Sequence, residues 1–376
     1  MAVGLIRGKG IFPVLLVLAG LAYWWLHPKT PGVISTGYIS ETGVPLWNTL
    51  AQVRQQVAEL HYGDRVEILR QEGTSARVRT AAGATGWLLD SRQIMNTELW
   101  QQVADLSARA RTLPVQARGV TKTVSNVRIE PGRDASRIFQ FLRGSPVVVL
   151  ERKVADAPQA SEEPPPEDST PKDQDRKPKH EDWFLVQQAE GWGTKGPASL
   201  GKSEAASTGG ASTSGPVSGG PAEAQIAATG TATQPIAGWV LARFIELDLP
   251  GPVRDYATSA ALHVVAWFEL DRVPDGSGGH AAQYLVAGSH PGEGQACDFT
   301  MLRVYTWGAA RRRYETAFVE NNLCGKLPVR VSSSPAGPEF HFQESGDNAP
   351  ERTYVMRQTV VRRLKQAEPT AARPRR

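Results

Sequence analysis

The sequence predicts a mainly β protein with two related small β units, a connecting helix and a larger antiparallel β module. Three observations lead to this prediction: an internal repeat, short strand-like segments separated by glycine, and a C-terminal stretch of alternating apolar and polar residues. The 376 residues are 40% hydrophobic and include ten tryptophans, enough for two or three domains with cores. The net charge of +4 is too small to indicate a nucleic-acid partner.

The repeat is visible in two phrases. TGWLLDSRQI at 85–94 returns as AGWVLARFIE at 237–246, 152 residues later. YGDRVEILR at 62–70 is similar to RGSPVVVLE at 143–151, but here the offset is 81. The second copy is therefore longer by the difference, 71 residues, and the extra residues lie between Leu150 and Gly238.

Each copy contains an ordered set of motifs. An apolar strand is followed by a Leu-x-x-Gly-x-x-Val-x-[apolar]-Leu hairpin, a short strand and a Gly-Trp-[apolar] strand. This order resembles the bacterial SH3 domain family, in which a Trp-x-x-Val strand precedes the Gly-Trp strand. The second copy keeps that Trp in WFLV at 183–186, whereas the first has ARVR at 76–79. The wider arrangement is similar to bacterial extracytoplasmic proteins that contain SH3 domains and have no defined role.

The resemblance implies two SH3-like barrels with specific roles for their aromatic residues. Trp87, Trp183 and Trp239 are expected in the barrel cores, because a tryptophan fills a large share of so small an interior. SH3-like folds bind ligands in grooves lined by aromatic residues near loops. The candidates that lie beside turn residues, each of which could instead be packing, are Tyr38, Trp47 and Tyr62.

Two long insertions are expected inside the second barrel. Aligning Trp183 on Ala76 gives an offset of 107, so 26 extra residues precede this strand and 45 follow it. The stretch 155–181 is rich in proline and charge, and 190–235 consists mainly of small residues. Neither composition can bury enough apolar surface to offset the loss of chain entropy, which predicts disordered loops.

Between and after the two copies the pattern changes. Residues 96–113 predict a helix with Thr97 as a possible cap and with Leu99, Val103, Leu106 and Ala110 at helical spacing. From Pro252 onward, alternating runs predict an antiparallel all-β meander of seven or eight strands. The predicted bounds are 1–29 for a signal or anchor, 33–95 for the first barrel, 96–113 for the helix, 118–249 for the second barrel, 252–365 for the meander and 366–376 for a basic tail.

The N-terminus predicts export across a membrane. Arg7 and Lys9 precede an uncharged run at 11–26, an arrangement that places residue 1 in the cytoplasm. Gly20-Leu21-Ala22 could be a signal-peptide cleavage site, while Tyr23 and the tryptophans after it suit the outer interface of a retained span. We expect a single-pass inner-membrane protein with most of its chain extracytoplasmic; the alternative is a periplasmic protein exported after cleavage.

Cys297 and Cys324, the only cysteines, are expected to form a disulfide. The runs that contain them flank GAAR at 308–311, a turn that predicts one antiparallel hairpin. With Ala310 and Arg311 as the central residues, paired positions sum to 621, which sets the two cysteines opposite each other. A turn centred at Ala309 and Ala310 would offset them by two residues. The alternative is two separate buried thiols.

The sequence contains no motif typical of a catalytic or metal-binding site. Cys297 followed by His341 has the residue order of papain-like cell-wall hydrolases, but Cys297 opens a strand-like run rather than a helix. The histidines lack metal-ligand spacing, and no motif indicates a cofactor. We therefore expect a non-catalytic binding or scaffold protein of the bacterial cell envelope, whose SH3-like modules contact wall peptide, glycan or partner proteins. The alternatives are a cysteine hydrolase and a structural subunit of an envelope complex.

Overall fold

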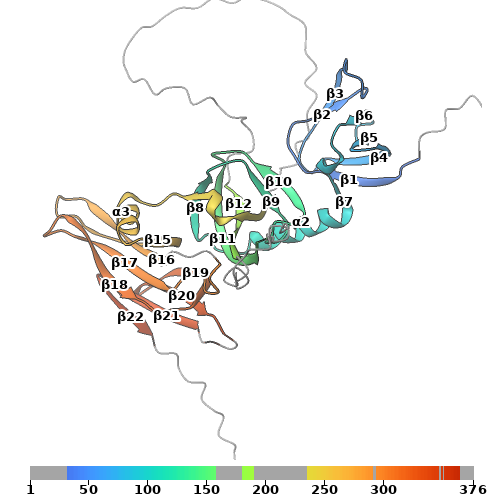
Figure 1. Cartoon of the computed structure of the whole chain (residues 1–376). Coiled ribbons are helices and arrows are strands. Elements are labelled where there is room, and N and C mark those ends of the chain that lie inside the picture. The colour runs from blue at the N-terminus through green and yellow to red at the C-terminus, as the bar shows by residue number, and fades with distance from the viewer. Residues whose placement is uncertain are drawn as a thin grey trace, which may run out of the picture. The chain divides into compact units, whose positions relative to one another are not determined.

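The computed structural model describes residues 32–157, 180–189, 235–290, 294–346, 349 and 351–364 (Figure 1). The chain divides into two compact units, Met1–Trp100 and Gln101–Arg376, which are described separately. Both are built mainly of antiparallel strands. The predicted signal or anchor at 1–29, the basic tail, and most of both predicted insertions lie outside the described residues.

The first unit contains one seven-stranded sheet, the first repeat. Its strands pair in the order β3-β2-β6-β5-β4-β1-β7, and the sheet does not close into a barrel within the described residues. One face carries a compact apolar cluster that includes Ile39, Leu46, Val66, Val78 and Leu88. The elements are β1 (Ser35–Ile39), β2 (Val44–Trp47), β3 (Gln56–Leu60), β4 (Arg65–Glu72), β5 (Ser75–Thr80), β6 (Thr85–Leu88), the 3-10 helix η1 (Ser91–Gln93) and β7 (Ile94–Asn96).

The second unit begins with a sheet of the same design, the second repeat. Its order, β10-β9-β13-β12-β11-β8-β14, is the first order with each strand replaced by its counterpart, as the internal repeat predicts. The elements are β8 (Ala117–Thr121), β9 (Ser125–Arg128), β10 (Arg137–Phe141), β11 (Pro146–Asp156), β12 (His180–Gln188), β13 (Ala237–Leu241), the 3-10 helix η3 (Ala242–Phe244) and β14 (Ile245–Leu247).

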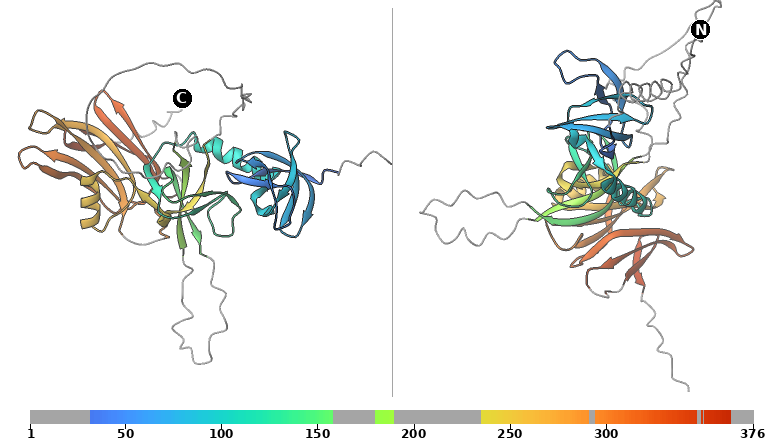
Figure 2. Two further views of the ribbon diagram at one scale, coloured as in Figure 1. Left: turned by 90° about the horizontal axis from the view of Figure 1, so that it is seen from above. Right: turned by 90° about the vertical axis from the view of Figure 1, so that its right-hand side faces the viewer.

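Strand register corrects the alignment of the two copies. Val78 pairs with Gly86 in the first repeat, and Val186 pairs with Gly238 in the second. The offset between these valines is 108, so the predicted offset of 107 was wrong by one residue. The predicted bounds of the first insertion, 155–181, also overlap the strands, because β11 and β12 remain paired as far as Asp156 and His180. This long two-stranded arm ends where the described residues end (Figure 2).

Two of the three tryptophans expected in the cores, Trp183 and Trp239, are buried in a core cluster, but all three point away from the face that Gly86 and Gly238 occupy. Successive residues of a strand point to opposite faces, and Gly86 and Gly238 occupy the inner face. The residue after each glycine, Trp87 or Trp239, therefore points to the other face. Trp87 is only half-buried there. Trp239 and Trp183 are fully buried, but in a cluster on the outer face of the second sheet that also contains Ala110.

Two α-helices occur in the described residues. Helix α2 (Thr97–Ala110) was predicted, although the side chain of Asn96, rather than Thr97, accepts the capping hydrogen bond from the Leu99 N–H at 2.7 Å. Helix α3 (Gly251–Ser259) was not predicted, because its nine residues show only a weak apolar stripe with Val253 and Ala257 buried.

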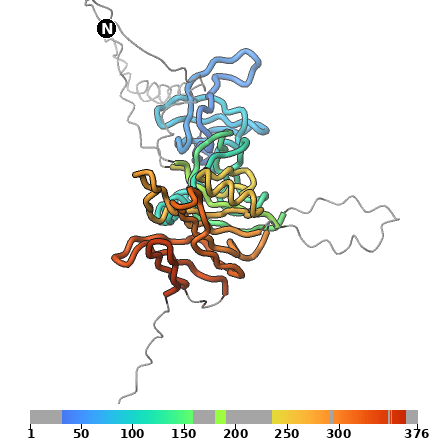
Figure 3. The backbone as a smooth tube through the Cα atoms, turned by 90° about the vertical axis from the view of Figure 1, so that its left-hand side faces the viewer, coloured from blue at the N-terminus to red at the C-terminus, as the bar shows by residue number. Residues whose placement is uncertain are grey.

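The C-terminal module forms two sheets rather than one meander. Strands β15 (His263–Pro274), β16 (His280–Ser289), β17 (Met301–Gly308) and β18 (Arg313–Glu320) form one sheet. Strands β19 (Gly325–Ser334), β20 (Gly337–Glu344), β21 (Glu351–Arg357) and β22 (Val360–Leu364) form the other. The rings of Phe318 and Tyr354 meet between the two sheets, with their centres 5.8 Å apart. Figure 3 draws the backbones of the two sheets in orange and red.

The glycines of the two Gly-Trp pairs provide a test of the repeat. A Cβ on Gly86 would lie 2.6 Å from Leu46 Cγ, and one on Gly238 would lie 2.4 Å from Val127 Cγ1. We expect Gly86→Ala and Gly238→Ala each to lower the free energy of unfolding by about 1 to 3 kcal/mol through overpacking. Gly251→Ala is the control, since nothing lies within 4 Å of its added Cβ. Urea unfolding with unchanged midpoints for Gly86→Ala and Gly238→Ala would refute this close packing.

Candidate functional site

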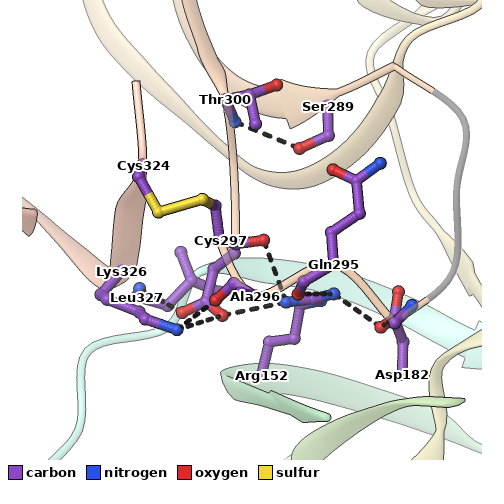
Figure 4. A network of polar contacts seen from close by, with 12 residues as sticks. Arg152, Asp182, Ser289, Gln295, Ala296, Cys297, Thr300, Cys324, Lys326 and Leu327 are labelled. Atoms are coloured by element: carbon purple, nitrogen blue, oxygen red, sulfur yellow. Dashed lines mark hydrogen bonds and ion pairs between the residues drawn. A yellow bond between two sulfur atoms is a disulfide. The ribbon is translucent and has the colours of Figure 1, made fainter. Parts of the chain in front are cut away.

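A buried arginine joins the second repeat to the C-terminal module. The side chain of Arg152 on β11 is only 3% exposed. It donates hydrogen bonds to the carboxylates of Asp182 and Asp298 at 2.6 and 3.0 Å, and to the main-chain oxygens of Gln295 and Cys297 at 3.0 and 3.2 Å (Figure 4). The guanidinium thus has both charge partners and hydrogen-bond acceptors, which a buried cation requires. Arg152 therefore clamps the β11–β12 arm to the loop at 294–298.

That loop is itself held in place by covalent and polar contacts. Cys297 forms a disulfide with Cys324, as the sequence predicts. The second carboxylate oxygen of Asp298 accepts a hydrogen bond from the Leu327 N–H at 2.8 Å, and Lys326 Nζ donates to the Ala296 carbonyl oxygen. These contacts hold the acceptors that face Arg152 in place independently of the guanidinium.

The hairpin behind the disulfide has the predicted register near its turn. Gly308 pairs with Arg313 and Tyr305 with Thr316, and both pairs sum to 621. A bulge then shifts the pairing by one residue before the strands end at Met301 and Glu320. The two cysteines lie beyond these ends, so the disulfide closes the base of the hairpin.

The opposite face of the same arm lines a pocket. On β12, Asp182 points toward Arg152, so the residues on either side of it, Glu181 and Trp183, point to the other face. Trp183 lines a pocket of about 220 Å³ between β9, the β9–β10 loop, β12 and η3. The remaining lining residues are Val124, Asn126, Arg128, Arg133, Leu241, Arg243 and Phe244.

Three arginines give this pocket its charge. Glu181, whose side chain is 4% exposed, accepts hydrogen bonds from Arg133 and from Arg243, the latter at 2.9 Å. The hydrogen bond from Arg133 is the main reason why the pKa of Glu181 is lowered. Burial lowers the pKa of Arg128, the third arginine, which also donates to the Ala135 carbonyl oxygen. Three guanidinium groups thus lie at the pocket beside the rings of Trp183 and Phe244, with the carboxylate of Glu181 bound to two of them and Asp134 near the third.

Of the three aromatic residues that the sequence suggested as ligand contacts, the structure brings Tyr38 and Tyr62 together on one ring and leaves Trp47 apart. Tyr38 stacks on Trp100 at 4.8 Å, and Tyr62 meets the same ring edge-on at 5.7 Å. Burial raises the pKa of Tyr62, consistent with a packed ring. Trp47 lies elsewhere in the first repeat, directly opposite Trp87, with the Arg54 guanidinium 4.7 Å from its ring centre. The three candidates therefore do not form one site.

The residues of the arginine pocket were not predicted from the sequence. Arg128 and Arg133 lie in and beyond a short strand, and Arg243 follows the Gly-Trp strand, so they are up to 115 positions apart. Trp183 was selected, but for the barrel core. The one signal available in the sequence was an arginine near the same point after each Gly-Trp pair, Arg92 five residues after Trp87 and Arg243 four residues after Trp239.

The two residues of the hydrolase alternative, Cys297 and His341, each have another partner in the structure. The sulfur of Cys297 is in the disulfide, and His341 Nε2 lies 3.7 Å from a Glu351 carboxylate oxygen. Among the described residues, no group of three or more His, Cys, Asp or Glu side chains is arranged to hold a metal ion.

A second, larger hollow of about 610 Å³ lies along β14 and α3. Its lining is mainly apolar, and it also contains Lys122, Arg254 and His263.

Comparisons with known proteins do not assign the chain to a family. No family model, curated protein or solved structure gives a significant match. Within the ranges that the structure describes, no helix has the length and apolar character needed to cross a membrane.

The clamp around Arg152 can be tested by removing its cation. Arg152→Met removes the cation that Asp182 and Asp298 share, leaving Asp298 with only Lys326 at 3.7 Å, and should lower the free energy of unfolding by about 3 to 5 kcal/mol. Arg272→Met, which breaks the exposed pair with Glu269, should have little effect. Adding Asp182→Asn and Asp298→Asn to Arg152→Met should recover part of the loss. Urea unfolding of the two single variants and the triple variant measures these changes. A decrease in the free energy of unfolding for Arg152→Met no larger than that for Arg272→Met would contradict the clamp.

The lowered pKa of Glu181 predicts a pH-dependent contribution to stability. A carboxylate whose pKa is lower in the folded state stabilises the fold above its ordinary value of 4.5, and this stabilisation is lost as the pH falls through the folded-state pKa. Glu181→Gln should therefore be less stable than the parent at pH 7, and the difference should shrink below pH 4.5. Unfolding midpoints at pH 7 and pH 3 provide the measurement. An equal difference at both pH values would show that the charge of Glu181 is not responsible.

Proposed function

We propose that the protein is a non-catalytic binding or scaffold protein of the bacterial cell envelope, and that its second repeat is an SH3-like module whose arginine pocket binds the ligand. The resemblance to bacterial SH3 domains supports the proposal that the repeats are SH3-like modules. The two repeats share one strand order, and each has a 3-10 helix after its Gly-Trp strand. The resemblance implies a groove beside loops, and the pocket lies between the β9–β10 loop, the start of β12 and η3.

The observation that carries the proposal is the composition of the pocket. Arg128, Arg133 and Arg243 place three guanidinium groups along its lining, and Trp183 and Phe244 provide an apolar wall. Guanidinium groups bind carboxylates with paired hydrogen bonds, and aromatic walls bind apolar side chains. A peptide with a free carboxylate next to an apolar group satisfies both requirements. Peptides of the cell wall and acidic segments of partner proteins have this chemistry.

The proposed setting follows from the sequence. Arg7 and Lys9 before an uncharged run support export with the N-terminus inside. The disulfide between Cys297 and Cys324 suits an oxidising compartment outside the cytoplasm. Protease added to spheroplasts should therefore digest the chain beyond Lys29, and complete protection of that region would exclude the envelope setting.

The ligand is tested with purified peptidoglycan. The full chain should sediment with it, and Arg128→Gln or Phe244→Ser should weaken binding about tenfold, as expected for the loss of one charged hydrogen bond or one apolar contact. Arg362→Gln, an exposed arginine on β22, is the matched control. Binding that is unaffected by the pocket variants would overturn the assignment of the site. If the chain does not bind peptidoglycan, and a membrane protein co-purifies with the parent chain but not with the pocket variants, the pocket binds a partner protein instead.

A further inference from the structure

The β15–β18 sheet carries a row of aromatic side chains on its outer face. Its inner face packs against the β19–β22 sheet through residues such as Phe318. On the outer face, Trp267, Tyr284, Trp307 and Tyr314, one from each of the four strands, form what we call the aromatic strip. Trp307 pairs with Tyr314, and Tyr284 pairs with Tyr305, two residues before Trp307, so these side chains point to the same side.

The rings of the strip contact one another in sequence. The centres of Trp267 and Tyr284 are 6.3 Å apart, those of Tyr284 and Tyr314 are 5.9 Å apart, and those of Tyr314 and Trp307 are 5.3 Å apart. All four side chains are half-buried rather than enclosed. The strip is therefore a continuous aromatic surface that crosses the whole sheet and remains partly open to solvent.

Neighbouring elements hold the strip in place. Helix α3 covers one end of the face, where Tyr256 stacks on Tyr305 at 5.0 Å and donates its hydroxyl hydrogen bond to the Tyr314 carbonyl oxygen. At the other end, Trp307 Nε1 donates to the Asp275 carbonyl oxygen at 3.0 Å. Rings that are already fixed lose little conformational entropy when a ligand binds, which favours binding to an open surface.

A cationic turn adjoins the Trp307 end of the strip. Arg311, Arg312 and Arg313 lie at the β17–β18 turn and are exposed. Glu315 is the carboxylate that pairs with this turn, at 2.9 Å from Arg311 and 3.6 Å from Arg313. The carboxylate of Asp275 in the neighbouring turn accepts hydrogen bonds from the N–H groups of Ser277 and Gly279. The turn therefore has an excess of positive charge.

We propose that the aromatic strip and the Arg311–Arg313 turn together bind an anionic polysaccharide. The apolar C–H face of a sugar ring packs on an aromatic ring, while tyrosine hydroxyls and guanidinium groups bond to its hydroxyls and carboxylates. The part of this face that α3 leaves exposed is a surface that can accommodate an extended polymer. Two contacts in the strip, those of Trp267 with Tyr284 and of Trp307 with Tyr314, are edge-to-face, at 69° and 72°, so ring edges and faces alternate along it. This mixed surface fits sugar rings better than flat bases, which need parallel ring faces.

The test measures binding of the full chain to defined polymers by affinity electrophoresis. Alginate and polygalacturonate are the anionic polysaccharides, dextran is the neutral one, and poly-glutamate and a single-stranded oligonucleotide are anionic polymers of other classes. We expect both uronate polymers to retard the protein with at least tenfold higher affinity than the other three, and the affinity to fall as salt rises. The proposal is overturned if neither uronate polymer binds, or if poly-glutamate or the oligonucleotide binds equally well.

Variants then locate the surface. Trp307→Ala and, separately, the triple change Arg311→Ser, Arg312→Asn and Arg313→Ser should each weaken alginate binding at least tenfold. Arg311 and Arg312 lie in the exposed turn and Arg313 is the exposed first residue of β18; Asn suits the positive φ of 50° at Arg312, so the sheet should tolerate the triple change. The matched controls are Trp87→Ala in the first repeat and Arg362→Ser with Arg363→Ser on β22. Equal loss of binding in the controls, or none in the test variants, would contradict the assignment. The peptidoglycan test of the arginine pocket is independent, because its variants lie in another domain.

Discussion

The buried cation of Arg152 is the interaction on which the second repeat and the C-terminal module depend together. Its guanidinium donates to two carboxylates and two carbonyl oxygens from two separate parts of the chain, β12 and the loop at 294–298, and the disulfide ties that loop to Cys324. A charge so far from water is stable only when all these acceptors are present. Because Asp182 is one of them, the start of β12 is held firmly, and Glu181 and Trp183 beside it are presented to the arginine pocket.

The two repeats keep one fold but use its outer face differently. Trp47 lies opposite Trp87 in the first repeat, whereas Arg128 occupies the place of Trp47 opposite Trp239 in the second. In the second repeat this face is covered around Trp183 and Trp239 by Ala110 and by partly buried Leu106 and Phe244, so that a small pocket remains at its edge. The inner faces of the two repeats are alike in one respect: Gly86 and Gly238 each leave room for the side chain beneath them, Leu46 or Val127.

The sequence predicted features that follow from local pattern or from the repeat, and missed those that need three-dimensional proximity. The repeated topology, helix α2, the hairpin register and the disulfide were all predicted. The tryptophans were assigned to the wrong face because a Gly-Trp motif does not say which of its two residues points inward. Helix α3 was missed because it is short, and the C-terminal strands were joined into one meander because sequence gives no sheet partner. The arginine pocket was missed because Arg133 and Arg243, 110 positions apart in the sequence, both donate to Glu181 only once the chain is folded.

Amide hydrogen exchange of the full chain, with and without soluble cell-wall peptides, tests the central claim that the second repeat binds ligand through the pocket beside the clamped arm. The loop at 129–136, the start of β12 at 180–184 and η3 at 242–244 supply most of the lining and its supporting charge. Bound peptide should slow exchange in these three segments and leave the first repeat at 35–96 unchanged. Slowed exchange in the first repeat alone, or no change in any of the three segments, would contradict the claim.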